Sequence, residues 1–154
     1  MDIEEQYDKI YRYCYFKMYD VQIAQDITQE TFLRFCKQGL NLGSDKELPY
    51  LYTIAKNLCI DHFRKRTVES LEEITEEVID DPTEDLISNL TLRMTISKLP
   101  EDEQELIFLR YVNEVSITTI CKITGLSRFA VYRKLSKSLK WLKEELLKEG
   151  FSNG

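Results

Sequence analysis

Apolar residues recur every three or four positions along most of this chain. Near the N-terminus the repeat is carried by Ile3, Tyr7, Ile10, Tyr11, Cys14, Tyr15 and Met18. This spacing is typical of an amphipathic α-helix with one buried face, and it predicts a helix over residues 2–19. The chain has no β-rich segment and no internal repeat at the periods that mark solenoids. The pattern therefore predicts an all-α protein.

The first domain is predicted to hold three helices. The second spans about residues 21–38 and opens after Asp20, a favourable N-cap. Its apolar side is formed by four residues: Ile23, Ile27, Phe32 and Phe35. Glycines then break the chain before Pro49, which suits the first turn of a helix that runs to about Arg66. Three helices around one apolar centre would complete a domain at residues 1–66.

A second domain is predicted over residues 84–154, after an acidic linker at 67–83. Thr83 can cap a helix that continues through Leu86, Leu90, Met94 and Leu99. Pro100 starts another helix. The interior positions of that helix are expected at Leu106, Ile107, Leu109 and Tyr111. We expect these two helices to pack beneath the segment that follows.

The stretch of residues 116–142 predicts two short helices joined by a tight turn. Ser116 caps the first, which places Ile117, Ile120 and Cys121 on one face. Gly125 ends it, because glycine adopts positive φ without steric cost. Ser127 can cap the next helix. Four of its residues are predicted to face inward: Val131, Leu135, Leu139 and Leu142. This arrangement predicts a helix-turn-helix.

The outer face of the last helix is basic and aromatic. Between Lys122 and Lys143 the chain has seven Lys or Arg and no Asp or Glu. A helix with such a face, after a helix and a glycine turn, has the dimensions to lie in a DNA major groove. The predicted DNA-binding residues are Ser127, Arg128, Phe129, Tyr132, Arg133, Lys134 and Lys137, with Lys140 further along. An ordinary surface helix in an all-α domain is the alternative.

The net charge of −6 hides this basic segment. Residues 67–98 hold 9 acidic and 2 basic residues, whereas acid and base nearly balance in the other parts of the chain. Four cysteines, at positions 14, 36, 59 and 121, are far apart without a C-x-x-C pair, so we expect reduced core thiols rather than disulfides or a zinc site. The acidic N-terminus and the lack of a long apolar run predict a soluble intracellular protein.

Motifs in both predicted domains resemble the extracytoplasmic-function (ECF) family of bacterial RNA polymerase sigma factors. AQDITQETFLRF at residues 24–35 is similar to the helix that binds core polymerase. LPYLYTIAKNLCIDHFRKR at 48–66 is similar to the promoter-melting helix, and LPEDEQELIFLRYVNEVSITTICKITGLSRFAVYRKL is similar to the domain that reads the minus-35 element. The chain departs from the family at Tyr50, where Trp is usual, at residues 119–121, where Glu-Ile-Ala is common, and at Phe129 and Ala130, where Gly-Thr is usual. The resemblance therefore implies no particular promoter base preference.

The resemblance implies roles for residues of the first domain. Core polymerase would be bound by Asp26, Gln29, Glu30, Phe32, Leu33 and Arg34. The single-stranded minus-10 element would be met by the loop at residues 39–47 and by Asn57, Asp61, Arg64 and Lys65. Aromatic and basic side chains together suit stacking on unpaired bases and contact with phosphates. The linker would either occupy a basic channel built for RNA or serve as a solvated tether.

The predicted function is thus a promoter-specificity factor whose partners are core RNA polymerase and promoter DNA, with an anti-sigma protein left open as a further partner. No catalytic residue, metal, cofactor or small-molecule substrate is predicted. The expected location is the cytoplasm, or the membrane surface if an anti-sigma protein holds the chain there. One alternative is a helix-turn-helix regulator whose first domain senses a ligand or forms a dimer. Another is a metal-dependent hydrolase using Asp61 and His62, which the absence of an accompanying carboxylate cluster disfavours.

Overall fold

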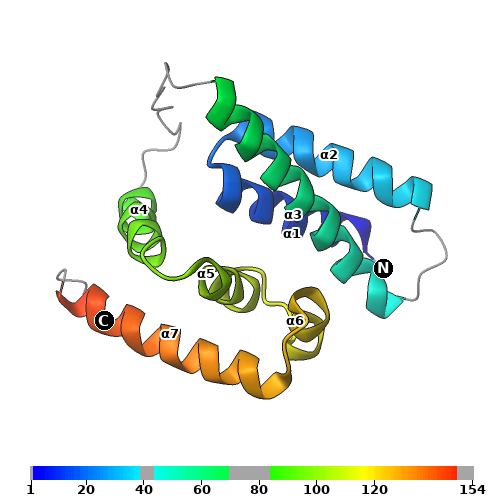
Figure 1. Ribbon diagram of the computed structural model, residues 1–154. Helices are drawn as coiled ribbons and strands as arrows, with labels where there is room; N and C mark the ends of the chain where they lie inside the picture. Colours follow the sequence, from blue (N-terminus) through cyan, green and yellow to red (C-terminus); the bar gives the residue numbers. More distant parts are fainter. Residues whose placement is uncertain (1, 39–43, 70–83, 149–154) are drawn as a thin grey trace. The chain divides into compact units, whose positions relative to one another are not determined.

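The computed structural model describes residues 2–38, 44–69 and 84–148, and every regular element in these ranges is a helix (Figure 1). The chain forms two compact units. The first holds three helices: α1 (Ile3–Met18), α2 (Val21–Gln38) and α3 (Ser44–Glu69). The second holds α4 (Glu84–Ile96), α5 (Glu101–Ile107), the π-helix η1 (Phe108–Val112), most of α6 (Ile117–Thr124) and α7 (Arg128–Lys148). The predicted all-α fold is confirmed. Most of the expected linker, including Thr83, lies outside the described residues.

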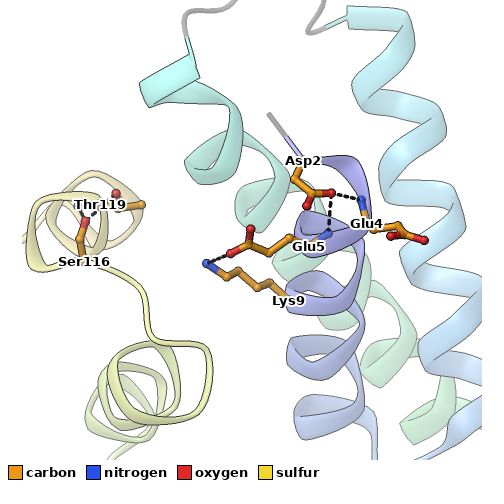
Figure 2. Close-up of polar contacts among 6 residues, drawn as sticks. All are labelled: Asp2, Glu4, Glu5, Lys9, Ser116 and Thr119. Carbon is orange, nitrogen blue, oxygen red and sulfur yellow. Dashed lines mark hydrogen bonds and ion pairs between the residues drawn. The ribbon is translucent and has the colours of Figure 1, made fainter.

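Side-chain caps define where α1 and α2 begin. The carboxylate of Asp2 accepts hydrogen bonds from the backbone N–H groups of Glu4 and Glu5, at 3.1 and 3.4 Å (Figure 2). Tyr19 ends α1 in the left-handed conformation, with φ of 55°. Asp20 then accepts from the N–H of Ile23 at 2.9 Å, as predicted for the N-cap of α2. The two helices are therefore joined by a short connection with defined geometry.

The core of the first unit lies between α1, α2 and α3. Ile10, Cys14 and Met18 are buried on the predicted face of α1, whereas Ile3 is exposed. The core also contains residues that the apolar pattern missed: Tyr13, whose ring meets Tyr52 edge-on at 5.3 Å, and Thr28 and Thr31. The two threonine hydroxyls donate to backbone carbonyls one turn earlier in α2, which satisfies them without water.

The predicted start of α3 was wrong. The helix begins at Ser44, so Pro49 lies inside it and residues 44–47 are helical rather than loop. A proline at the sixth position has no N–H for the carbonyl of residue 45, so α3 lacks one backbone hydrogen bond there. Residues 39–43, the rest of the loop expected to meet DNA, lie outside the described residues.

The four cysteines are free thiols, but they do not share one environment. Cys14 and Cys59 are buried, and a hydrogen bond from the Cys59 thiol lowers the pKa of Cys14. Cys36 is exposed on α2 and Cys121 is partly exposed, so the prediction of core thiols was wrong for Cys36. Cys36 follows Leu33 on the outward face of α2, which explains its exposure.

The core of the second unit is formed where α4 and α5 pack against α7, with buried residues of η1 following α5. Leu106, Ile107 and Leu109 are buried as predicted, but Phe108 is buried as well and Tyr111 is 51% exposed. The cause is the π-helical turn, in which the N–H of Asn113 bonds to the carbonyl of Phe108. This widened turn rotates the residues after Leu109 away from the positions that a regular helix would give them.

Three other predicted interior positions proved to be exposed. On α4, Leu90 and Met94 are exposed, and Thr95 and Ile96 are buried among residues 90–96, the part of this helix whose side chains are described. On α7, Leu139 is 38% exposed while Ser138 is buried at 1%. Ser138 aligns with Val131, Leu135 and Leu142 at helical spacing, so the inward face of α7 includes one polar residue.

Candidate nucleic-acid interface

The turn between α6 and α7 has the backbone geometry of a helix-turn-helix. Ser116 caps α6 by accepting from the N–H of Thr119 at 3.2 Å, and its hydroxyl also donates to the Thr119 hydroxyl (Figure 2). Gly125 ends α6 with φ of 77°, and Ser127 accepts from the N–H of Ala130 at 3.1 Å at the start of α7. All three predictions are confirmed. Nothing lies within 4 Å of a β-carbon placed on Gly125, so backbone conformation rather than space demands glycine there.

The outward face of α7 is exposed along its length. The exposed members of the predicted DNA-binding set are Ser127, Arg128, Phe129, Tyr132, Arg133 and Lys137, and Lys140 is exposed too. Val131 and Leu135, on the opposite face, are buried. The burial pattern therefore fixes which side of the basic helix faces solvent. From Arg128 to Lys143 the helix has no acid of its own, and exposed cations of this kind attract the phosphate backbone of a nucleic acid.

Two cations of this helix have partners within the second unit. The guanidinium of Arg128 donates to the hydroxyl of Thr118 on α6 at 2.8 Å. The ammonium of Lys134 donates to the carboxylate of Asp102 on α5 at 2.6 Å, and Lys134 is only partly exposed. The hydrogen bond from Lys134 is the main reason why the pKa of Asp102 lies below its ordinary value.

A second polar contact joins α5 to α7 below the exposed face. The hydroxyl of Ser138 donates to the carboxylate of Glu103 at 2.9 Å, and both side chains are buried. Consecutive residues of α5, Asp102 and Glu103, thus contact positions one turn apart on α7. These two contacts fix the rotation of the recognition helix α7 about its own axis.

Sequence reasoning missed the residues that hold α7 in place: Thr118, Asp102, Glu103 and Ser138. Thr118 and Asp102 are exposed polar residues of ordinary type, and no local pattern separates them from their neighbours. For Ser138 a signal was present, since positions 131, 135, 138 and 142 follow a 4-3-4 spacing that also describes a buried helix face. A serine on that face indicates a polar partner inside the unit.

A second exposed polar surface lies on α3. Asn57, Asp61, Arg64 and Lys65 are all exposed, and their spacing of four, three and one places them on one side of the helix. Phe63 is also exposed, but helical spacing places it on a different side of α3. Near the start of α3 the ring of Tyr50 packs against Phe35 on α2, with centroids 6.0 Å apart, and its hydroxyl donates to Gln38 at 3.1 Å. The aromatic residue that replaces tryptophan is therefore anchored in the first unit.

The third surface is the outward side of α2. Asp26, Gln29, Leu33 and Arg34 are exposed there, and Glu30 is partly exposed. Asp26 accepts from Gln22 at 3.1 Å, and Arg34 pairs with Glu30 at 3.0 Å, so these charges are satisfied along the helix. Phe32 is half buried, with its ring 5.4 Å from that of Tyr7 on α1. Leu33 is the apolar centre of this otherwise polar surface.

Two features are absent from residues 2–38, 44–69 and 84–148, the part of the chain that the structure describes. No helix among them is long and apolar enough to span a bilayer. Within the same ranges, no three His, Cys, Asp or Glu side chains are grouped so that they could hold a metal ion.

An all-helical protein with a capped glycine turn and a basic recognition helix belongs to the class of helix-turn-helix DNA-binding proteins. Comparison with known families narrows this class. Residues 3–68 match the family described as Sigma-70 region 2, and residues 89–142 match Sigma-70, region 4.

Individual relatives agree with these matches. The chain is 32% identical over 159 residues to the ECF RNA polymerase sigma factor SigW of Bacillus subtilis. This alignment covers 90% of this chain and 83% of SigW. It is 31% identical over 140 residues to the ECF RNA polymerase sigma factor BldN of Streptomyces coelicolor, covering 80% of this chain. That match spans 51% of BldN, about half of its length.

A solved structure supports the fold. The sigma factor RpoE of Bartonella quintana, crystallised with the anti-sigma factor NepR, matches with a TM-score of 0.70 at 22% identity, over 95% of this chain and 94% of that one. The chain belongs to the extracytoplasmic-function family of RNA polymerase sigma factors. As a sigma factor it directs transcription initiation, and the family is not one of enzymes.

Proposed function

We propose that this sigma factor binds core polymerase and promoter DNA through the three surfaces described above. The observation that carries the proposal is the exposed basic face of α7 from Arg128 to Lys143, which has no acid of its own and is held by contacts from α5 and α6. This face reads the minus-35 element as duplex DNA, because a helix fits the major groove and presents side chains to base edges. The proposed contacts are Ser127, Arg128, Phe129, Tyr132, Arg133, Lys134 and Lys137.

The minus-10 element is bound as a single strand by α3. Asn57 and Asp61 offer hydrogen-bonding groups for base edges, while Arg64 and Lys65 hold phosphates. The ring of Phe63 is exposed on another side of the same helix, so the proposed contacts to the single strand are the four polar residues. This combination suits melted rather than duplex DNA.

Core polymerase is bound by α2, through Asp26, Gln29, Glu30, Phe32, Leu33 and Arg34. Exposed Leu33 supplies apolar contact area, and the surrounding charges supply specificity. Replacing Asp26 and Glu30 by Lys should weaken assembly with core polymerase at unchanged helix content. The matched control replaces Glu4 and Asp8 of α1, exposed acids of the same unit, by Lys. Equal core binding by the two double variants would refute the assignment of α2.

The same proposal covers location and regulation. The chain acts in the cytoplasm, where core polymerase works, and it needs no catalytic group or cofactor of its own. RpoE of Bartonella quintana was crystallised with an anti-sigma factor. We extend that class of partner to this chain, which an anti-sigma protein would hold inactive, at the membrane if that protein is itself anchored there.

One experiment tests the function directly. The full chain is mixed with bacterial core polymerase and genomic DNA, and the 5′ ends of the transcripts made in vitro are sequenced. The expected result is a set of start sites that share two upstream elements and depend on both proteins. A helix-turn-helix regulator would instead bind its DNA without core polymerase, and starts that do not depend on this chain would contradict the proposal.

A further inference from the structure

Phe129 is exposed to an extent that folding does not explain. Its side chain is 76% accessible, the highest value among the large apolar residues of the described ranges. It lies at the second position of α7, two residues after the cap Ser127. An apolar ring left in water at this position contributes little to stability, because burial is what makes such a side chain stabilising.

The contacts of its neighbours leave Phe129 projecting from the start of α7. Arg128 is drawn back toward α6 by its hydrogen bond to Thr118, and Lys134 is drawn toward α5 by Asp102. At about 100° per residue, Phe129 and Arg133 share the face opposite the buried Val131 and Leu135. The side chains that point straight outward from the first two turns are therefore an aromatic ring and a cation.

The chemistry of the major groove offers one apolar group to such a ring. Thymine carries a C5 methyl group there, and the other three bases present hydrogen-bonding groups and no methyl. Phe129 has no donor or acceptor, so it cannot discriminate bases by hydrogen bonds. The seven Lys and Arg from residue 122 to 143, with no acid between them, are complementary in charge to the phosphates on both sides of the groove.

We propose that Phe129 is a specificity-determining residue that contacts the methyl group of one thymine in the minus-35 element. The inference rests on the proposed function, since it requires α7 to lie in the major groove. Arg133, one turn further along the same face, contacts the DNA at a neighbouring base pair. The ring acts by excluding water from the methyl group, which a base without that methyl cannot reproduce.

The test removes the methyl group alone. The minus-35 element is first selected from a randomised upstream region with the holoenzyme of the full chain and core polymerase. Each thymine of the selected element is then replaced, one at a time, by deoxyuridine, which keeps the pairing and loses only the methyl. We expect one replacement to weaken holoenzyme binding about three- to fivefold, the effect of one buried methylene-sized group.

Two variants complete the test. Phe129→Ala holoenzyme should bind the thymine and deoxyuridine promoters equally, whereas Arg133→Ala holoenzyme should bind both more weakly and keep the discrimination. Equal binding of all deoxyuridine promoters by the unaltered holoenzyme, or a selected element without thymine, would overturn the inference and leave the proposed function intact. Promoter binding that does not require this chain would refute the proposed function itself.

Discussion

The conformation of one residue, Gly125, sets the path of the chain from α6 into α7. Its φ of 77° is costly for any residue with a β-carbon, while the space around it is open. Gly125→Ala should therefore lower the free energy of unfolding by about 1–2 kcal/mol through backbone strain alone. Urea titration of the full chain measures this. Gly125→Asn is the matched variant, because asparagine tolerates the left-handed region, and it should cost less than alanine. An equal cost for both would show that the cause is not φ.

Ser138 is a single polar residue on the buried face of α7. Its hydroxyl satisfies the buried carboxylate of Glu103 at 2.9 Å. Ser138→Ala should lower the free energy of unfolding by about 1–3 kcal/mol, because it leaves a buried acceptor without that donor. Ser136→Ala, at an exposed position of the same helix, is the control and should change stability by less than about 0.5 kcal/mol. Chemical denaturation of both variants measures their free energies of unfolding. Similar losses of stability in the two variants would contradict a specific role for the Ser138 hydroxyl.

At the scale of elements, the ion pair between α5 and α7 gives the second unit a pH dependence. The pKa of Asp102 is lowered in the fold by Lys134, so folding favours the charged form. Its contribution is present above the ordinary aspartate pKa of 3.8 and is lost as the pH falls through the lowered value in the folded state. For a largely exposed pair the coupling should be about 0.2–1 kcal/mol at neutral pH.

A double-mutant cycle measures that coupling. Asp102→Asn, Lys134→Met and the double variant are unfolded in urea at pH 7 and again at a pH below the titration of Asp102. The coupling energy should be present at pH 7 and vanish in acid, because a protonated carboxyl no longer pairs with the ammonium. A coupling that is the same at both pH values would rule out the ion pair as its origin.

The proposed role of α7 in binding DNA predicts a difference between the start of the helix and its later turns. Residues near the start of a recognition helix reach base edges, whereas those further along hold phosphates. Lys137→Ala and Lys140→Ala should each reduce the slope of log affinity against log salt by about 0.9, with unchanged base preference. Lys148→Ala, at the end of α7 where Lys148 pairs with Glu145, serves as the control. Holoenzyme binding at several salt concentrations gives the slopes, and a slope unchanged in all three variants would contradict the assignment.

At the scale of the whole molecule, each compact unit has its own buried residues, such as Ile10 and Tyr52 in the first and Leu106 and Val131 in the second. Fragments 1–69 and 84–154 should therefore both be helical when expressed separately. Because domains of about 60–70 residues bury a smaller share of their surface than larger domains do, each should be only marginally stable. Circular dichroism with thermal melting tests this. A fragment without helix would show that the units depend on each other for folding.

The sequence by itself determined the features that depend on residues a few positions apart. The caps Asp20, Ser116 and Ser127 and the turn at Gly125 were predictable, because side-chain oxygens and glycine act on the nearest backbone groups. The exposed basic face of α7 was predictable for a similar reason. A helix repeats its faces every three or four residues, and a run without acid needs no tertiary contact to be seen.

Only the tertiary structure decided which side chains hold the recognition helix. Ser138 and Glu103 are 35 residues apart in the chain, and Lys134 and Asp102 are 32 apart. Hydropathy placed Leu139 inside, but the fold leaves it 38% exposed and buries Ser138 instead, because a serine that bonds to a carboxylate can be buried. The hydrogen bond from Arg128 to Thr118, which leaves Phe129 projecting, also depends on how α6 and α7 pack. No local pattern of residues encodes the 2.8 Å distance between these two side chains.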